Sequence, residues 1–190
     1  MLTAIYQSVF RPSSLVENQR AYDFVRRYGW ILIVVRWLYY SILFQFRDYH
    51  GRWSPFWPPP FGLDTDTYAK LQRSLSLPFG VVFMLVLSIS LAAYLRVIQK
   101  TTSVVTVLNI LGVTFFLPFV LAQPVDQVII ALIGWKLVLV TVIHTALLFW
   151  ESWAATEIIS STNELRVSQK VTGTVILSVV WILIAGSLWR

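Results

Sequence analysis

The stretch from Val128 to Trp150 constrains the fold of this chain more than any other part. It reads VIIALIGWKLVLVTVIHTALLFW, and as a helix it is about long enough to cross a ~30 Å hydrocarbon core. Two ionisable residues, Lys136 and His144, lie within it. Such groups are costly inside a membrane, so both are candidate functional residues. We expect the rest of the chain to form helices packed around this one.

The composition predicts a polytopic membrane protein. The 190 residues are 57% hydrophobic and only 13% charged, whereas a soluble domain is about one quarter charged. The formal net charge of +6 indicates contact with anionic lipids and no nucleic-acid partner. The sequence contains no cysteine, which excludes disulfides and thiolate metal sites.

Apolar stretches predict an all-α fold, a bundle of five transmembrane helices preceded by an N-terminal amphipathic helix. The predicted spans are residues 28–46, 77–98, 103–121, 128–150 and 171–189. Residues 1–27 are expected to form a cytoplasmic or interfacial segment, followed by the transmembrane domain, residues 28–190. Basic residues are more frequent in the loops on the N-terminal side. This predicts a cytoplasmic N-terminus and an outer C-terminus, in a prokaryotic inner or plasma membrane.

The connections carry local signals of their own. Ser14 and Glu17 have the spacing of a capping box at the start of the N-terminal helix. Residues 66–75 predict a short helix before the second span. Pro124 predicts a tight turn over residues 122–127, which would make the third and fourth spans a hairpin. The polar residues 151–170 predict a loop before the last span.

Polar residues inside the predicted spans are the main site candidates. Arg36 would extend to the interface, pair with a carboxylate of a partner chain or hold a lipid phosphate. We expect Arg36 or Lys136 to hold an anion between subunits, and Arg suits this better because its planar fork can bind two oxygens. Asn109 is expected to form an interhelical hydrogen bond, with a ligand contact as the alternative.

His144 is expected to be a hydrogen-bonded packing residue. The alternative is an axial ligand to a haem or chlorophyll-type ring, which needs one neutral imidazole in an apolar span. No other cofactor is expected. A metal site is not expected either, because His50 and His144 are the only histidines and the carboxylates lie outside the predicted spans.

Aromatic residues and prolines crowd the connection between the first two spans. It reads RWSPFWPPPFG from Arg52 to Gly62, and its three consecutive prolines force an extended backbone. Trp53, Trp57 and Phe61 are expected to lie in the membrane interface. There they would either close the rim of the bundle or dock a partner.

The sequence lacks recognisable catalytic motifs. No predicted span contains Asp or Glu, which argues against a carboxylate proton relay. There is no HExxH, no P-loop and no Ser–His pair on a recognisable scaffold. These absences predict a protein without enzymatic activity.

Three features resemble one known family. The tripeptide FRP at residues 10–12 precedes a short amphipathic helix, a compact helical block spans residues 77–188, and SQK at residues 168–170 leads into the last span. Together they resemble the Yip-domain family, integral membrane proteins with a cytoplasmic N-terminal segment and five helices. The resemblance implies a non-enzymatic scaffold or assembly protein of prokaryotic type, with no catalytic centre.

Two other functions remain open at this point. One is an accessory subunit of a large energy-converting or transport complex, which binds pigment or lipid. The other is a small-solute carrier. The expected partners are membrane lipids, mainly anionic ones, and other integral membrane subunits.

Overall fold

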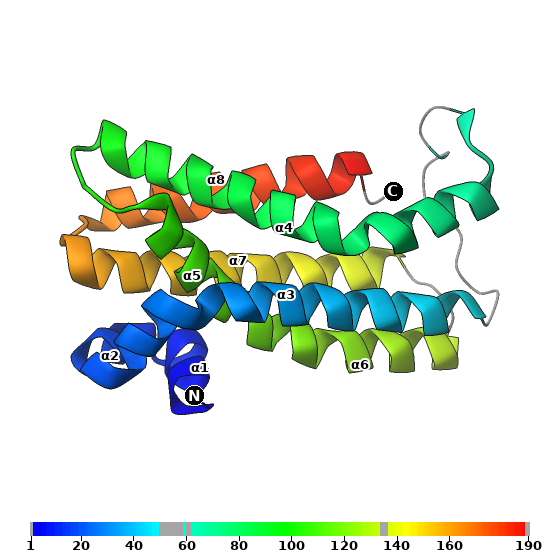
Figure 1. The fold of residues 1–190 in the computed structure, drawn as a ribbon, viewed down its shortest axis with the longest axis horizontal. Helices are drawn as coiled ribbons and strands as arrows, with labels where there is room; N and C mark the ends of the chain where they lie inside the picture. Colours follow the sequence, from blue (N-terminus) through cyan, green and yellow to red (C-terminus); the bar gives the residue numbers. More distant parts are fainter. Residues whose placement is uncertain (1, 50–58, 60–61, 134–136, 189–190) are drawn as a thin grey trace.

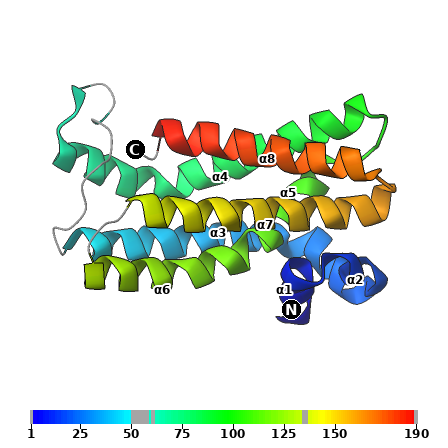
Figure 2. The same cartoon turned by 180° about the vertical axis from the view of Figure 1, so that it is seen from behind.

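The computed structural model describes residues 2–49, 59, 62–133 and 137–188, and these residues form helices and no strands. The helices are α1 (Leu2–Phe10), α2 (Pro12–Glu17), α3 (Gln19–Tyr49), α4 (Thr65–Val97), α5 (Val104–Thr114), α6 (Phe116–Ile133), α7 (Leu137–Asn163) and α8 (Val167–Leu188). The long helices α3, α4, α6, α7 and α8 run side by side along the long axis of the molecule (Figure 1, Figure 2). The predicted all-α class is confirmed for the described residues.

One end of the bundle brings together segments that are far apart in the sequence. The helices α1 and α2, the connection from α4 to α5 and the turn from α7 to α8 all lie there (Figure 1). We call this end the N-terminal end of the bundle. The helices α3, α6 and α8 run away from it, and α4 and α7 return to it.

Three described stretches are long and apolar enough to cross a membrane. They are Ser74–Val97, Val104–Asp126 and Val167–Ile184, and they correspond to the second, third and fifth predicted spans. The first and fourth predicted spans fall mainly within α3 and α7, and their crossing of the membrane stays a prediction.

Two predicted loops are helical. Pro124 lies inside α6, so the predicted turn over residues 122–127 is wrong. An apolar helix tolerates a proline when its neighbours satisfy the carbonyl left free. The loop predicted over residues 151–170 is wrong for its first part, because α7 continues to Asn163. Ala155 and Ile158 in this part are fully buried.

The predicted short helix over residues 66–75 is the start of α4. Asp64 caps this helix: its carboxylate accepts hydrogen bonds from the backbone N–H of Thr67 at 2.8 Å and from the Thr67 hydroxyl at 2.6 Å. These bonds, the side-chain one first, hold the pKa of Asp64 below its ordinary value. The cap therefore starts one continuous helix that extends through the second predicted span to Val97.

The N-terminal segment folds as α1, α2 and the first turns of α3. Arg11 separates α1 from α2, so a new helix begins within the tripeptide FRP at residues 10–12. The capping box does not form, because Ser14 lies inside α2 and its hydroxyl donates to the carbonyl of Arg11. Leu15 is fully buried, and the indole of Trp150 on α7 donates to the carbonyl of Val9 at 3.1 Å. The segment is thus docked against the bundle.

The helices α3 and α5 cross at backbone contact distance. A Cβ atom at Gly29 would lie 1.9 Å from the carbonyl oxygen of Asn109, and one at Gly112 would lie 2.2 Å from the carbonyl oxygen of Gly29. The Asn109 side chain accepts a hydrogen bond from the backbone N–H of Trp30 at 2.8 Å and donates one to the carbonyl of Val105 at 3.0 Å. The interhelical hydrogen bond predicted for Asn109 is confirmed.

Phe115 separates α5 from α6. Pro118 accounts for this break, because it has no N–H to donate to the carbonyl of Thr114 and its ring crowds that carbonyl. The hydroxyl of Thr114 in turn donates to the carbonyl of Ile110 at 3.1 Å. The interruption places the backbone of Phe115 opposite α3, where the buried site begins.

Candidate functional site

Arg36 lies inside the bundle, where α3 faces the break between α5 and α6. Only 3% of the residue is exposed, and its Nη1 donates to the carbonyl of Phe115 at 2.7 Å. Its guanidinium carbon lies 4.3 Å from the ring centroid of Phe119 and 5.6 Å from that of Phe115. A desolvated cation–π contact contributes about 2 kcal/mol, and a hydrogen bond from a charged group about 1.5–3 kcal/mol. Together they offset an insertion cost of a few kcal/mol.

A buried carboxyl group on α7, that of Glu151, interacts with Arg36. Glu151 is only 4% exposed. Its carboxylate interacts electrostatically with the Arg36 guanidinium without a direct ion pair. An attraction of this kind is stronger in an apolar interior than in water. Arg36 thus connects three parts of the bundle: its own helix, the α5–α6 break and α7.

A second buried carboxylate contacts His144. Asp126 on α6 has a side chain that is 4% exposed, and its Oδ2 lies 2.7 Å from Nε2 of His144 on α7, whose side chain is 29% exposed. The hydrogen bond predicted for His144 is confirmed. Because Nε2 is engaged, Nδ1 is the ring nitrogen left for axial ligation, and that role stays a prediction.

The two charged contacts lie at different depths along the same pair of helices. On α6, Phe119 precedes Asp126 by about two helical turns, and on α7, His144 precedes Glu151 by the same interval. Asp126 and Glu151 lie just outside the predicted spans, but the apolar stretch Val104–Asp126 is longer than the third predicted span and includes Asp126. One buried carboxyl group thus lies at each of the two depths.

Four predicted site residues lie outside the described residues. They are Lys136, Trp53, Trp57 and Phe61. Their lipid or partner contacts stay predictions, and so does the anion predicted for Arg36. In the described residues the Arg36 side chain is turned to the interior, so a lipid or a partner chain would reach it only if α3 moved away from Phe115.

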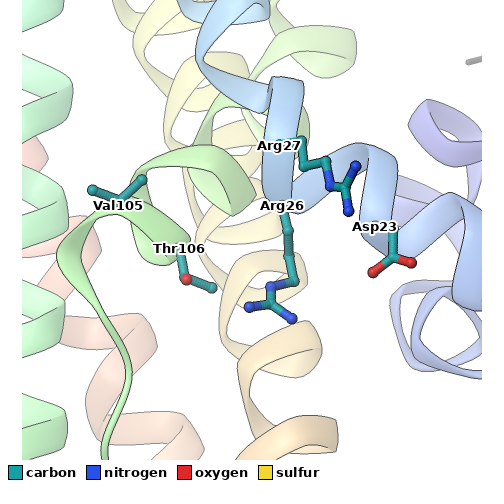
Figure 3. Close-up of a pocket in the computed structure, with 5 residues that line it drawn as sticks. All are labelled: Asp23, Arg26, Arg27, Val105 and Thr106. Carbon is teal, nitrogen blue, oxygen red and sulfur yellow. The ribbon is translucent and has the colours of Figure 1, made fainter.

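A surface notch opens at the N-terminal end of the bundle, between α3 and the first turn of α5 (Figure 3). Asp23, Arg26, Arg27, Val105 and Thr106 line it, and it encloses about 310 Å³. Figure 3 shows the two arginine side chains between Thr106 and Asp23. Both arginines are exposed. The notch is thus a small basic hollow in the outer surface.

Sequence reasoning missed the two carboxylates and the notch. Asp126 was assigned to a turn, because Pro124 two residues before it was interpreted as a helix end. Glu151 follows His144 by about two helical turns, a spacing that places both on one face and that was available as a signal. The notch had no comparable signal, since its residues come from helices that the sequence does not place together.

Chemically, the described residues offer charged contacts between helices and one basic surface hollow. Within the described ranges, no group of three His, Cys, Asp or Glu residues could hold a metal ion. Comparisons of this chain with protein-family models, with curated proteins and with solved structures find no match.

Proposed function

We propose that this protein is a non-enzymatic integral membrane scaffold or assembly protein, as its resemblance to the Yip-domain family implies. The observation that carries the proposal is the use of charged residues as contacts between helices. Arg36 binds the carbonyl of Phe115, and Asp126 contacts His144. Such contacts hold the helices in one register, which suits a fixed platform for other membrane chains.

The outer surface supports the same proposal. On α8 the exposed apolar residues Val171, Val175 and Val179 recur every helical turn. This side of the bundle faces lipid or the apolar helices of another subunit. In the proposed arrangement the chain crosses the membrane five times, its N-terminal end is cytoplasmic, and its partners are anionic lipids and other integral membrane subunits.

The second candidate is an accessory subunit of an energy-converting complex, or a small-solute carrier. The observation that favours it is the presence of two buried carboxyl groups: Asp126, which contacts His144, and Glu151, which interacts electrostatically with Arg36. Buried ionisable groups in a membrane protein commonly mark an ion or proton path. Proton or solute flux in proteoliposomes separates this candidate from a scaffold.

Native purification with mass spectrometry of bound chains tests the scaffold directly. A scaffold should carry one or more integral membrane chains in fixed proportion through gentle purification. A chain that is always isolated alone, and that conducts protons or a solute in proteoliposomes, would contradict the proposal.

A variant of Arg36 tests whether charged residues hold the helices of the bundle together. Arg36→Leu should lower the stability of the isolated bundle by about 1–3 kcal/mol, because the buried carbonyl of Phe115 loses its charged hydrogen-bond donor. The double variant Arg36→Leu/Glu151→Leu should lose less stability than the sum of the two single variants, because Glu151 interacts electrostatically with Arg36. Unfolding in mixed detergent micelles measures both. If Arg36→Leu is as stable as the unmodified chain but loses its partners, Arg36 binds an external anion instead.

A further inference from the structure

The notch between α3 and α5 has an unbalanced positive charge. Among the described residues, neither Arg26 nor Arg27 forms an ion pair, although Asp23 lies on the same wall. The carboxylate of Asp23 instead accepts a hydrogen bond from the amide of Gln19 at 3.1 Å. The guanidinium carbon of Arg26 lies 5.6 Å from the ring centroid of Tyr22. The Arg26 side chain is therefore held in place by a residue of its own helix, and its N–H groups remain available to bind a ligand.

The wall of the notch that α5 forms indicates the level at which the notch lies in the membrane. Val105 and Thr106 belong to the first turn of α5, where the apolar stretch Val104–Asp126 begins. A site at the first turn of a membrane-crossing helix lies at the level of the lipid headgroups. Val105 is 64% exposed, so the notch borders an apolar surface on the side where the acyl chains begin.

We propose that this notch binds the phosphate of an anionic phospholipid headgroup. The planar guanidinium groups of Arg26 and Arg27 match the geometry of phosphate oxygens. The hydroxyl of Thr106, which shares a hydrogen bond of 2.9 Å with that of Ser103, supplies a further polar contact. Val105 contacts the apolar part of the same lipid.

Size and charge narrow the lipid class. A volume of about 310 Å³ is at the lower end of the range for small-molecule sites, so the notch takes a headgroup and leaves the acyl chains on the bundle surface. Two cationic side chains repel the trimethylammonium of phosphatidylcholine and accept a headgroup with net negative charge. This assignment deepens the proposed function, because it rests on the membrane placement of α5.

Native mass spectrometry of the detergent-solubilised full chain tests the assignment. Short-chain phosphatidylglycerol is titrated in parallel with short-chain phosphatidylcholine. Arg26→Gln and Arg27→Gln should each weaken phosphatidylglycerol binding by about ten-fold, the effect of a charge-assisted hydrogen bond. Asp23→Asn should strengthen it, because the variant removes the negative charge beside the arginines.

The matched control is Arg96→Gln. Arg96 is exposed in the last turn of α4 at the same end of the bundle, and its replacement removes the same charge without touching the notch. This control should change binding by less than about two-fold, as expected for a screened surface charge. An equal loss for Arg96→Gln and Arg26→Gln would overturn the proposal, because diffuse surface charge would then explain the binding.

Inorganic phosphate distinguishes a lipid from a free anion as the source of the phosphate. If inorganic phosphate binds to the notch and phosphatidylglycerol does not, the lipid assignment is refuted. Co-purification of partner chains is measured on the same Arg26→Gln sample. Lost lipid with retained partners supports the lipid site and leaves the scaffold intact, whereas retained lipid with lost partners counts against the notch as the lipid site.

Discussion

Replacing Gly29 by alanine should push α3 and α5 apart at their closest crossing. The added Cβ would lie 1.9 Å from the carbonyl oxygen of Asn109, whereas a carbon and a carbonyl oxygen normally stay about 3.3 Å apart. The helices would have to separate by about 1.4 Å. The three atoms nearest to the new methyl group are all main-chain atoms of Asn109, so no side chain can rotate to make room.

The loss of stability in Gly29→Ala follows from this separation of the two helices. Overpacking of this kind costs about 1–3 kcal/mol. The hydrogen bond from the backbone N–H of Trp30 to Asn109, now 2.8 Å, would lengthen to about 4 Å and contribute about 1 kcal/mol less. Alanine recovers up to about 1 kcal/mol through its helix propensity. The net loss of stability in Gly29→Ala should therefore be about 1–3 kcal/mol.

Unfolding in mixed detergent micelles, followed by circular dichroism, measures this loss. Gly173→Ala is the matched control: Gly173 is also within a helix, but its added Cβ would lie 3.2 Å from a methyl group of Thr156 and 3.4 Å from one of Leu91. Those side chains can yield, so the control should be neutral or slightly stabilising. Equal stability of Gly29→Ala and Gly173→Ala would refute the backbone contact between α3 and α5.

Two further expectations concern α7 and the orientation of the chain. Asp126→Asn and His144→Gln should each destabilise the bundle by about 1–3 kcal/mol. A double-mutant cycle should show that the two losses are not additive. Additive losses would mean that the pair does not join α6 to α7. Reporter fusions at Arg190 and Gln99 should report opposite sides of the membrane, and the same side for both would mean that the predicted number of spans is wrong.

The apolar stretches were enough to predict the helical fold of the described residues and three stretches that are long and apolar enough to cross a membrane. What they could not predict is where the helices end. Residues 151–163 are polar in composition, yet three of their hydroxyls donate to carbonyls of their own helix: those of Thr156, Ser161 and Thr162. A polar composition therefore did not indicate a loop in this segment, which is part of α7.

Single residues of the candidate site were predicted from the sequence, but the contacts between them and their partners were not. Arg36, Asn109 and His144 were identified because polar groups in apolar stretches need partners. Their partners could not be identified from the sequence. The carbonyl of Phe115 bonds to Arg36 across the break associated with Pro118, and Asp126 was assigned to a turn. Both partners depend on how a helix accommodates proline, which hydropathy does not describe.

The docking of α1 on α7 has a consequence for biosynthesis. The bond from Trp150 to Val9 joins residues separated by 141 positions, so α1 leaves the ribosome long before its partner exists. At typical synthesis rates the delay is on the order of ten seconds or more. Until then α1 can pack only on α2, α3, α5 and α6, which are made earlier, and its contact with α7 can close while α8 is still being made.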